Sequence, residues 1–99
     1  MAEPCPTVTV TLLPGTEEYA ADIKSFFDFM VHKLYKHRQK GYWGDVDVKN
    51  YLGLLENEIG ELKEAIESGS VAWVIEESAD VANEALIIAS AMMRNAVKR

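Results

Sequence analysis

This chain of 99 residues lacks the features that mark secreted or membrane-spanning proteins. Its single cysteine, Cys5, has no second cysteine for an internal disulfide and fits a reducing compartment. The uncharged apolar run Ala85–Met93 is far shorter than the roughly 20 residues that a membrane helix needs. The N-terminus shows no charged segment followed by a long apolar core, so no signal peptide is expected. We therefore expect a cytoplasmic protein without a membrane partner, in which Cys5 is an unreactive residue of an N-terminal arm.

Positive charge is also scarce. Ten lysines and arginines stand against 16 aspartates and glutamates, which gives a formal net charge of −6 and a pI near 4.8. Duplex-binding proteins usually carry the opposite sign, so we expect no nucleic-acid partner. The length allows one domain at most, and a chain this short leaves much of its apolar surface uncovered. The composition therefore predicts self-association.

The first part of the chain differs in pattern from the rest. Residues 7–12 alternate between threonine and apolar side chains with the period of a strand, but no partner strand is visible. We therefore interpret residues 1–15 as an extended arm, either disordered or packed on a neighbouring subunit. Residues 16–99 form a single helical domain in this interpretation.

Apolar residues recur at helical spacing in three segments, which predict helices over about 16–39, 47–68 and 71–95. Thr16 is the expected N-cap of the first helix, and Gly41 is its expected stop. Asp45 or Asp47 can cap the second helix, and Ser70 can cap the third.

The third helix is apolar nearly all round its circumference, and such a helix is expected to be buried on every side. Three helices of one chain can hardly enclose it, so a second chain is expected to do so. The predicted fold class is all-α. It is a helical bundle of three to four helices per chain, completed by dimerisation or tetramerisation.

Two acidic couplets lie within the apolar faces of the second and third helices. Glu58 and Glu61 are three residues apart, as are Glu77 and Asp80, and such residues are neighbours on a helix surface. Glu84 falls close to Glu77 in projection and is a candidate fifth member. Because a short connection makes neighbouring helices antiparallel, the two couplets are expected to face each other. Carboxylates in such a setting repel each other unless some are protonated or a cation lies between them.

Several interpretations of these acids remain open. Glutamate is common on helix surfaces, and the couplets could simply be solvated charges. A di-iron carboxylate bundle would require Glu-x-x-His, and neither His32 nor His37 occupies such a position. The set is therefore all-oxygen, which favours a hard cation such as Mg²⁺, with Mn²⁺ as a substitute. A Mg²⁺ site in a small helical protein suggests phosphate chemistry.

A basic and aromatic segment follows the first helix in an otherwise acidic chain. It comprises Lys33, Lys36, His37, Arg38, Lys40 and Trp43. The simplest interpretation is that the cations complement the helix dipole and that the tryptophan anchors a turn. Beside a metal site the same cations could neutralise phosphate oxygens, and the tryptophan could stack on a nucleobase.

The sequence resembles the MazG-type all-α nucleoside triphosphate pyrophosphohydrolases. The resemblance lies in Leu55-Glu56-Asn57-Glu58-Ile59-Gly60-Glu61-Leu62-Lys63-Glu64-Ala65-Ile66 and in Glu77-Ser78-Ala79-Asp80-Val81-Ala82-Asn83, which follow that family's pattern of ExxE, a spacer and ExxD. Lys33-Leu34, Lys40-Gly41 and Trp43 are similar to a pattern upstream of the signature in phage-type members. The resemblance covers about residues 26–93.

The resemblance implies a helical bundle that dimerises or tetramerises and hydrolyses a nucleoside or deoxynucleoside triphosphate to the monophosphate and pyrophosphate. The implied Mg²⁺ ligands and catalytic residues are Glu58, Glu61, Glu77 and Asp80. The implied substrate-binding residues are Lys33, His37, Lys40, Trp43 and Asn83.

Two positions depart from the family's pattern. Asn57 stands where many members have a further glutamate, and His37 stands where an asparagine is expected. Neither departure removes an implied metal ligand. Two alternatives therefore stay open: a nucleotide-binding or regulatory module with little turnover, and a purely structural oligomerisation bundle.

Overall fold

The computed structural model describes residues 6–43 and 46–98, and side-chain burial is described as far as residue 95. All regular elements in these ranges are helical. Its elements are the 3-10 turn η1 (Glu17–Tyr19), α1 (Ala20–Lys36), the 3-10 turn η2 (Arg38–Lys40), α2 (Val48–Ser68) and α3 (Val71–Lys98). Residues 6–13 form neither helix nor strand, so their alternating pattern does not place them in a sheet. The expectations for Cys5 and Asp45 concern positions outside the described residues.

The predicted first helix is divided into three pieces. Thr16 precedes η1, but its hydroxyl donates to the carbonyl oxygen of Leu13 at 2.6 Å and accepts from no helical N–H, so the predicted side-chain cap is wrong. Regular α-helix begins only at Ala20 and ends at Lys36, after which η2 tightens the backbone into a 3-10 turn. Gly41, with φ of 82°, then reverses the chain as expected.

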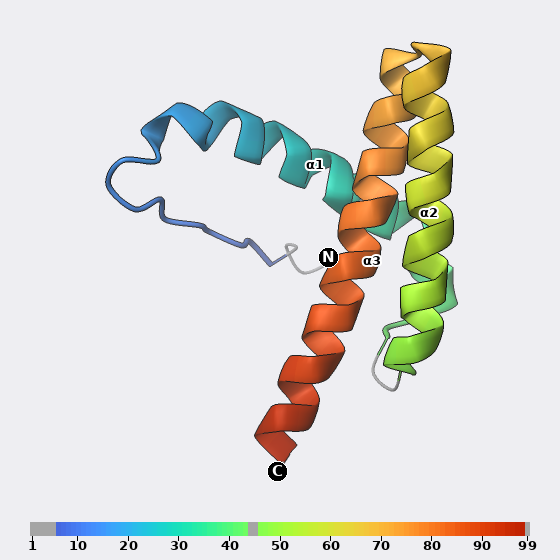
Figure 1. The fold of residues 1–99 in the computed structure, drawn as a ribbon. Helices are drawn as coiled ribbons and strands as arrows, with labels where there is room; N and C mark the ends of the chain where they lie inside the picture. The colour runs from blue at the N-terminus through green and yellow to red at the C-terminus, as the bar shows by residue number, and fades with distance from the viewer. Residues whose placement is uncertain (1–5, 44–45, 99) are drawn as a thin grey trace, which may run out of the picture.

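The other helix boundaries follow the sequence signals. The Asp47 carboxylate accepts a hydrogen bond from the backbone N–H of Lys49 at 3.0 Å and so caps α2. Gly69 ends α2 in the left-handed conformation, with φ of 75°. The Ser70 hydroxyl accepts from the backbone N–H of Trp73 at 3.2 Å at the start of α3. The resulting connection is short, and α2 and α3 run antiparallel side by side (Figure 1).

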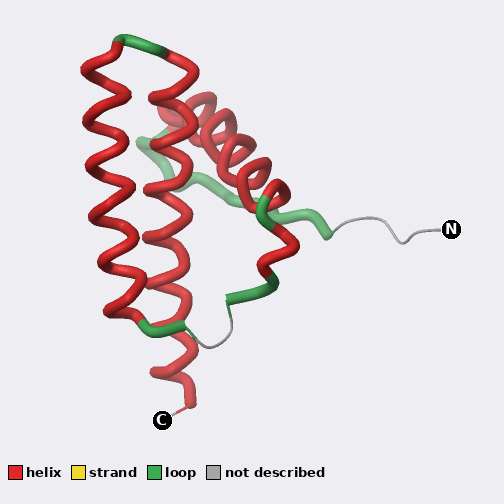
Figure 2. Tube along the Cα trace, turned by 90° about the vertical axis from the view of Figure 1, so that its right-hand side faces the viewer, coloured by secondary structure: helices red, strands yellow, loops and turns green. Residues whose placement is uncertain are grey.

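Helix α3 is the central element of the chain. It packs against α2 along much of its length and against α1, whereas α1 and α2 do not pack on each other within the described ranges. Helix α1 projects to one side of the α2–α3 pair (Figure 1). The view in Figure 2 shows the chain returning from the end of α1 to the start of α2. This return places the basic segment beside α3.

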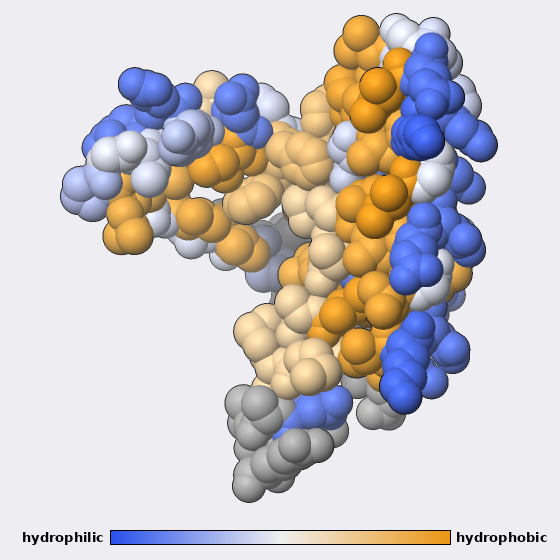
Figure 3. Space-filling model, in the orientation of Figure 1, coloured by the Kyte–Doolittle hydropathy of each residue, from blue (hydrophilic) through white to orange (hydrophobic). Residues whose placement is uncertain are grey.

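The interior is narrow and built from small side chains. The buried apolar residues are Ala65, Ala79, Ile87 and Ala91, and Asn83 is the buried polar one. The single chain leaves part of α3 uncovered, as the sequence predicts, because Val71 is 74% and Met93 61% exposed. Apolar side chains form a continuous face over α1 and α3 in Figure 3.

The chain is less compact than a typical monomer of its size. Its radius of gyration is 15.5 Å, against about 13 Å for an average 100-residue domain. Its accessible surface is 8083 Å², against roughly 5,700 Å² for a folded monomer of this mass. None of the helices in the described ranges combines the length and the hydrophobicity needed to cross a bilayer.

Candidate metal centre and pocket

The antiparallel packing of α2 and α3 brings three of the four predicted acids together. Glu58 from α2 and Glu77 and Asp80 from α3 each offer a carboxylate oxygen, and these oxygens lie within 4.8 Å of one another. All three side chains are half-buried. Glu61 is exposed and does not join the group. Glu58 meets Glu77 and Asp80 because each couplet lies near the middle of its helix and the short connection makes α2 and α3 antiparallel, which brings the two couplets to the same level.

The three carboxyls make an unfavourable environment for negative charge. Burial, then a side-chain hydrogen bond with Glu77 and the charges of Glu61, Asp80 and Glu77, together raise the pKa of Glu58 from 4.5 to about 7. One oxygen each of Glu58 and Glu77 (Oε2) is buried without a hydrogen-bond partner among the described residues. A cation between the carboxylates would relieve both the repulsion and the missing contacts.

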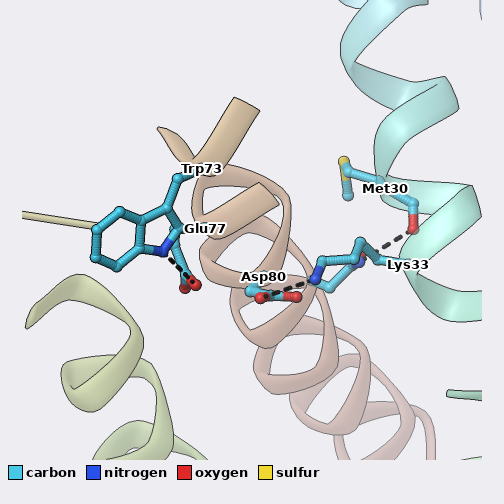
Figure 4. Close-up of polar contacts among 6 residues, drawn as sticks. Met30, Lys33, Trp73, Glu77 and Asp80 are labelled. Atoms are coloured by element: carbon cyan, nitrogen blue, oxygen red, sulfur yellow. Dashed lines mark hydrogen bonds and ion pairs between the residues drawn. The ribbon is translucent and has the colours of Figure 1, made fainter. Parts of the chain in front are cut away.

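Two side chains hold the carboxylates of α3 in place (Figure 4). The indole Nε1 of Trp73 donates to Glu77 Oε1 at 3.2 Å, one helical turn away. Lys33 from α1 lies with its Nζ 3.3 Å from Asp80 Oδ2. Trp73 has no role in the expectations drawn from the sequence, although its spacing of four residues from Glu77 is a local signal for this contact. The resemblance implies that Lys33 binds substrate, and in the structure Lys33 neutralises the Asp80 carboxylate.

A pocket of about 530 Å³ adjoins Asp80. All five of the predicted substrate-binding residues line it: Lys33 from α1, His37, Lys40 and Trp43 from the segment after α1, and Asn83 from α3. Its volume is in the range of small-molecule sites. Its lining combines the cations Lys33, Arg38 and Lys40 with the α3 acids Asp80 and Glu84, so the pocket offers positive charge to an anionic part of a ligand.

Trp43 lies beside Tyr42 in the lining of the pocket. It is half-buried, and its ring lies 5.3 Å from that of Tyr42. Its indole Nε1 is buried without a hydrogen-bond partner among the described residues. Its backbone carbonyl accepts from Arg94 Nη2 at 2.8 Å. The indole is therefore a fixed wall of the pocket.

Arg94 is a residue that the sequence analysis missed. Its Nη1 donates to the hydroxyl of Tyr42 at 3.0 Å and to Ser90 Oγ at 2.6 Å, in addition to the bond from Nη2 to Trp43. These bonds tie the segment that bears Trp43 to the C-terminal half of α3. No local pattern signals this contact, because Arg94 and Trp43 are far apart in the sequence.

Asn83 and Glu84 line the pocket from adjacent positions of α3. Asn83 is 7% exposed, its Nδ2 donates to the carbonyl oxygen of Met30 at 3.1 Å, and its Oδ1 has no partner in the described structure. Glu84, expected as a fifth member of the carboxylate group, lies outside the three-carboxylate set and lines the pocket instead. Burial and then the charge of Asp80 raise the pKa of Glu84, against an opposing effect of Lys40.

Comparison of the chain with protein-family models, with curated proteins and with solved structures gives no match. The resemblance to MazG-type enzymes therefore depends on the motif residues alone.

Proposed function

We propose that this chain is a Mg²⁺-dependent nucleoside triphosphate pyrophosphohydrolase that acts as a homo-oligomer. It would hydrolyse a nucleoside or deoxynucleoside triphosphate to the monophosphate and pyrophosphate. The observation that carries the proposal is the convergence of Glu58, Glu77 and Asp80 within 4.8 Å, next to a pocket lined by cations. The MazG-type motif, which contains these acids, supports the same activity.

The acids suit a hard divalent cation. Their donors are all oxygens, and two buried carboxylate oxygens, on Glu58 and Glu77, lack partners among the described residues. Glu58, Glu77 and Asp80 would hold Mg²⁺, or Mn²⁺ in its place. When bound, the metal would neutralise charge that develops on the phosphates during the reaction.

The remaining residues have separate tasks in this proposal. Lys33, His37 and Lys40 would bind phosphate oxygens, and Trp43 would stack on the nucleobase. Lys33 would exchange its present partner Asp80, 3.3 Å away, for phosphate. Glu61, the exposed acid whose charge raises the pKa of Glu58, would orient the attacking water. That water attacks the α-phosphorus in line, the bond to the bridging oxygen breaks, and pyrophosphate leaves.

The apolar surface that the single chain leaves exposed supports an oligomer. Stable protein interfaces bury about 800 Å² per partner, and obligate ones bury more. Exposed apolar residues on both α1 and α3, including Val31 at 63% and Met93 at 61%, would supply this interface. A second copy of the chain would then complete the bundle, as the apolar circumference of α3 also suggests.

The test of activity is a panel of nucleoside and deoxynucleoside triphosphates incubated with the protein and Mg²⁺, with monophosphate and pyrophosphate resolved by chromatography and ³¹P spectroscopy. Asp80→Asn and Glu58→Gln should abolish release, whereas Glu64→Gln, at an exposed position of α2, should not. Absence of release from every nucleotide by a folded, Mg²⁺-binding protein would reject the enzyme. Tight triphosphate binding without turnover would favour the regulatory module, and no response to Mg²⁺ would favour the structural bundle.

The test of assembly is the sedimentation-equilibrium mass compared with the chain mass of 11.1 kDa. We expect a dimer or tetramer. Val31→Lys and Met93→Lys should shift the mass toward the monomer, while Glu56→Lys on the exposed polar side of α2 should leave it unchanged. A monomeric wild-type protein at micromolar concentration would contradict this part of the proposal.

A further inference from the structure

Three polar atoms of pocket-lining side chains are buried and have no hydrogen-bond partner among the described residues. They are the Nε1 donor of Trp43 and two oxygens on adjacent residues of α3, Oδ1 of Asn83 and Oε2 of Glu84. Buried polar groups in native proteins are nearly always paired, because an unpaired group loses its hydrogen bonds to water. Three unpaired atoms in the wall of one pocket therefore indicate polar atoms of a ligand.

The orientation of Asn83 is determined by its other contact. Its amide nitrogen donates to the carbonyl oxygen of Met30 at 3.1 Å, and the opposite orientation would place two oxygens against each other. The unpaired atom of Asn83 is therefore an acceptor. The Glu84 carboxyl also accepts, whether ionised or protonated, through the oxygen that carries no proton. This part of α3 thus offers two neighbouring acceptors that require donors.

The position of these acceptors separates them from the metal centre. Glu84 follows Asp80 by one turn, which is about 6 Å along the helix axis. Asp80 belongs to the three-carboxylate group, whereas Glu84 does not. Trp43 lines the same pocket from the segment after η2. A nucleotide whose phosphates lie at Asp80 would present its base toward Glu84, Asn83 and Trp43.

We infer that this pocket selects nucleotides whose base carries an exocyclic amino group, and that Glu84, with Asn83, accepts the hydrogen bonds of that group. The inference rests on the proposed nucleotide site. The amino group meant is N4 of cytosine or N6 of adenine; uracil, thymine and guanine carry a carbonyl oxygen at that position, and the amino group of guanine is attached elsewhere on its ring. A carbonyl oxygen facing Glu84 and Asn83 would leave the protein acceptors unpaired and add repulsion between oxygens. Trp43 Nε1 supplies a donor for an acceptor on the sugar, since an indole stacked on the base cannot direct its in-plane N–H at that same base.

The experiment compares nucleotides that differ mainly in this group. The pairs are dCTP with dUTP and dATP with dITP, each assayed for kcat/KM with Mg²⁺. Binding of the α,β-methylene analogues, in which the scissile linkage is blocked, is measured in parallel by calorimetry. The wild-type protein should prefer the amino member of at least one pair roughly tenfold or more, since a well-placed hydrogen-bonded pair discriminates by about 1–3 kcal/mol.

Glu84→Gln is the decisive variant, because glutamine keeps the shape of the side chain and adds a donor that a carbonyl oxygen can accept. Glu84→Gln should bring the ratio of kcat/KM for the amino nucleotide to kcat/KM for the carbonyl nucleotide close to one, because it improves hydrolysis of the carbonyl nucleotide. Thermal unfolding verifies that the variant is folded. Glu64→Gln is the matched control and should keep the wild-type preference. A preference that survives unchanged in Glu84→Gln would overturn the role of Glu84.

The outcomes distinguish this inference from the proposed activity. Hydrolysis with equal use of amino and oxo bases overturns the inference and leaves the pyrophosphohydrolase intact. Amino-selective binding without hydrolysis supports the inference and overturns the activity. Failure of every analogue to bind overturns both.

Discussion

Lys33 on α1 and Asp80 on α3 form an ion pair with an Nζ–Oδ2 distance of 3.3 Å, and both side chains are largely buried, at 15% and 23% exposure. The pair joins the basic end of α1 to the acidic centre between α2 and α3 (Figure 4). In the metal-free protein the lysine therefore supplies positive charge at a carboxylate that a metal would otherwise neutralise.

Loss of Lys33 should leave the Asp80 charge without its partner. We expect Lys33→Met to lower the free energy of unfolding in metal-free buffer by about 2 kcal/mol. Adding Asp80→Asn to this variant should recover most of the loss, as a double-mutant cycle in urea would measure. Lys24→Met is the control. Its pair with Asp28 has the same distance of 3.3 Å but is 81% and 72% exposed, so its loss should cost under about 0.5 kcal/mol. Equal costs for the two lysine variants would contradict this account.

The stability of the metal-free protein should depend on the protonation of Glu58. Because its pKa is raised from 4.5 to about 7, the folded state binds this proton more tightly than the unfolded state does. The stabilisation is complete below pH 4.5 and is lost as the pH rises toward 7. Urea unfolding in buffer with chelator should show that the free energy of unfolding declines across this pH range. The decline should be smaller in Glu58→Gln. A wild-type decline no steeper than that of the variant would show that Glu58 does not retain its proton.

Magnesium should stabilise the wild-type protein, because a ligand that binds only the folded state adds RT ln(1 + [L]/Kd), or about 2.7 kcal/mol at one hundred times Kd. Asp80→Asn relieves repulsion among the carboxylates but leaves Lys33 without its partner, so its stability under chelation should stay close to that of wild type, and it should lose most of its response to Mg²⁺. Thermal unfolding against Mg²⁺ concentration measures both effects, with Glu64→Gln as the control. A full Mg²⁺ response in Asp80→Asn would place the ion elsewhere.

Arg94 should determine how firmly Trp43 is held. Arg94→Lys keeps the charge. Its single ammonium nitrogen cannot replace both Nη1, which donates to Tyr42 and Ser90, and Nη2, which donates to the Trp43 carbonyl. In a Trp73→Phe background, which leaves Trp43 as the single tryptophan, the variant should show greater acrylamide quenching of Trp43 fluorescence. It should also raise KM more than it lowers kcat. Unchanged quenching would indicate that the ring contact with Tyr42 holds Trp43 without Arg94.

The helical elements could be predicted in detail because their signals are local. Asp47, Gly69 and Ser70 act on backbone groups within a few residues, and the structure places each where its chemistry predicts. The start of α1 could not be predicted from Thr16, since its hydroxyl has a competing acceptor in the Leu13 carbonyl. The convergence of Glu58 with Glu77 and Asp80 follows from the short connection, which allows only antiparallel packing of two long helices.

The sequence by itself determined the three long helices, the caps of α2 and α3 and the presence of two acidic couplets, because propensity, capping and periodicity act over a few residues. Only the tertiary structure decided which acids meet, that Glu61 lies outside the group and Glu84 lines the pocket, and that Arg94 reaches the Trp43 segment. Those outcomes depend on the rotation of each helix about its axis and on the path of the chain from α1 to α2. Packing between distant segments sets both, and no local pattern encodes them.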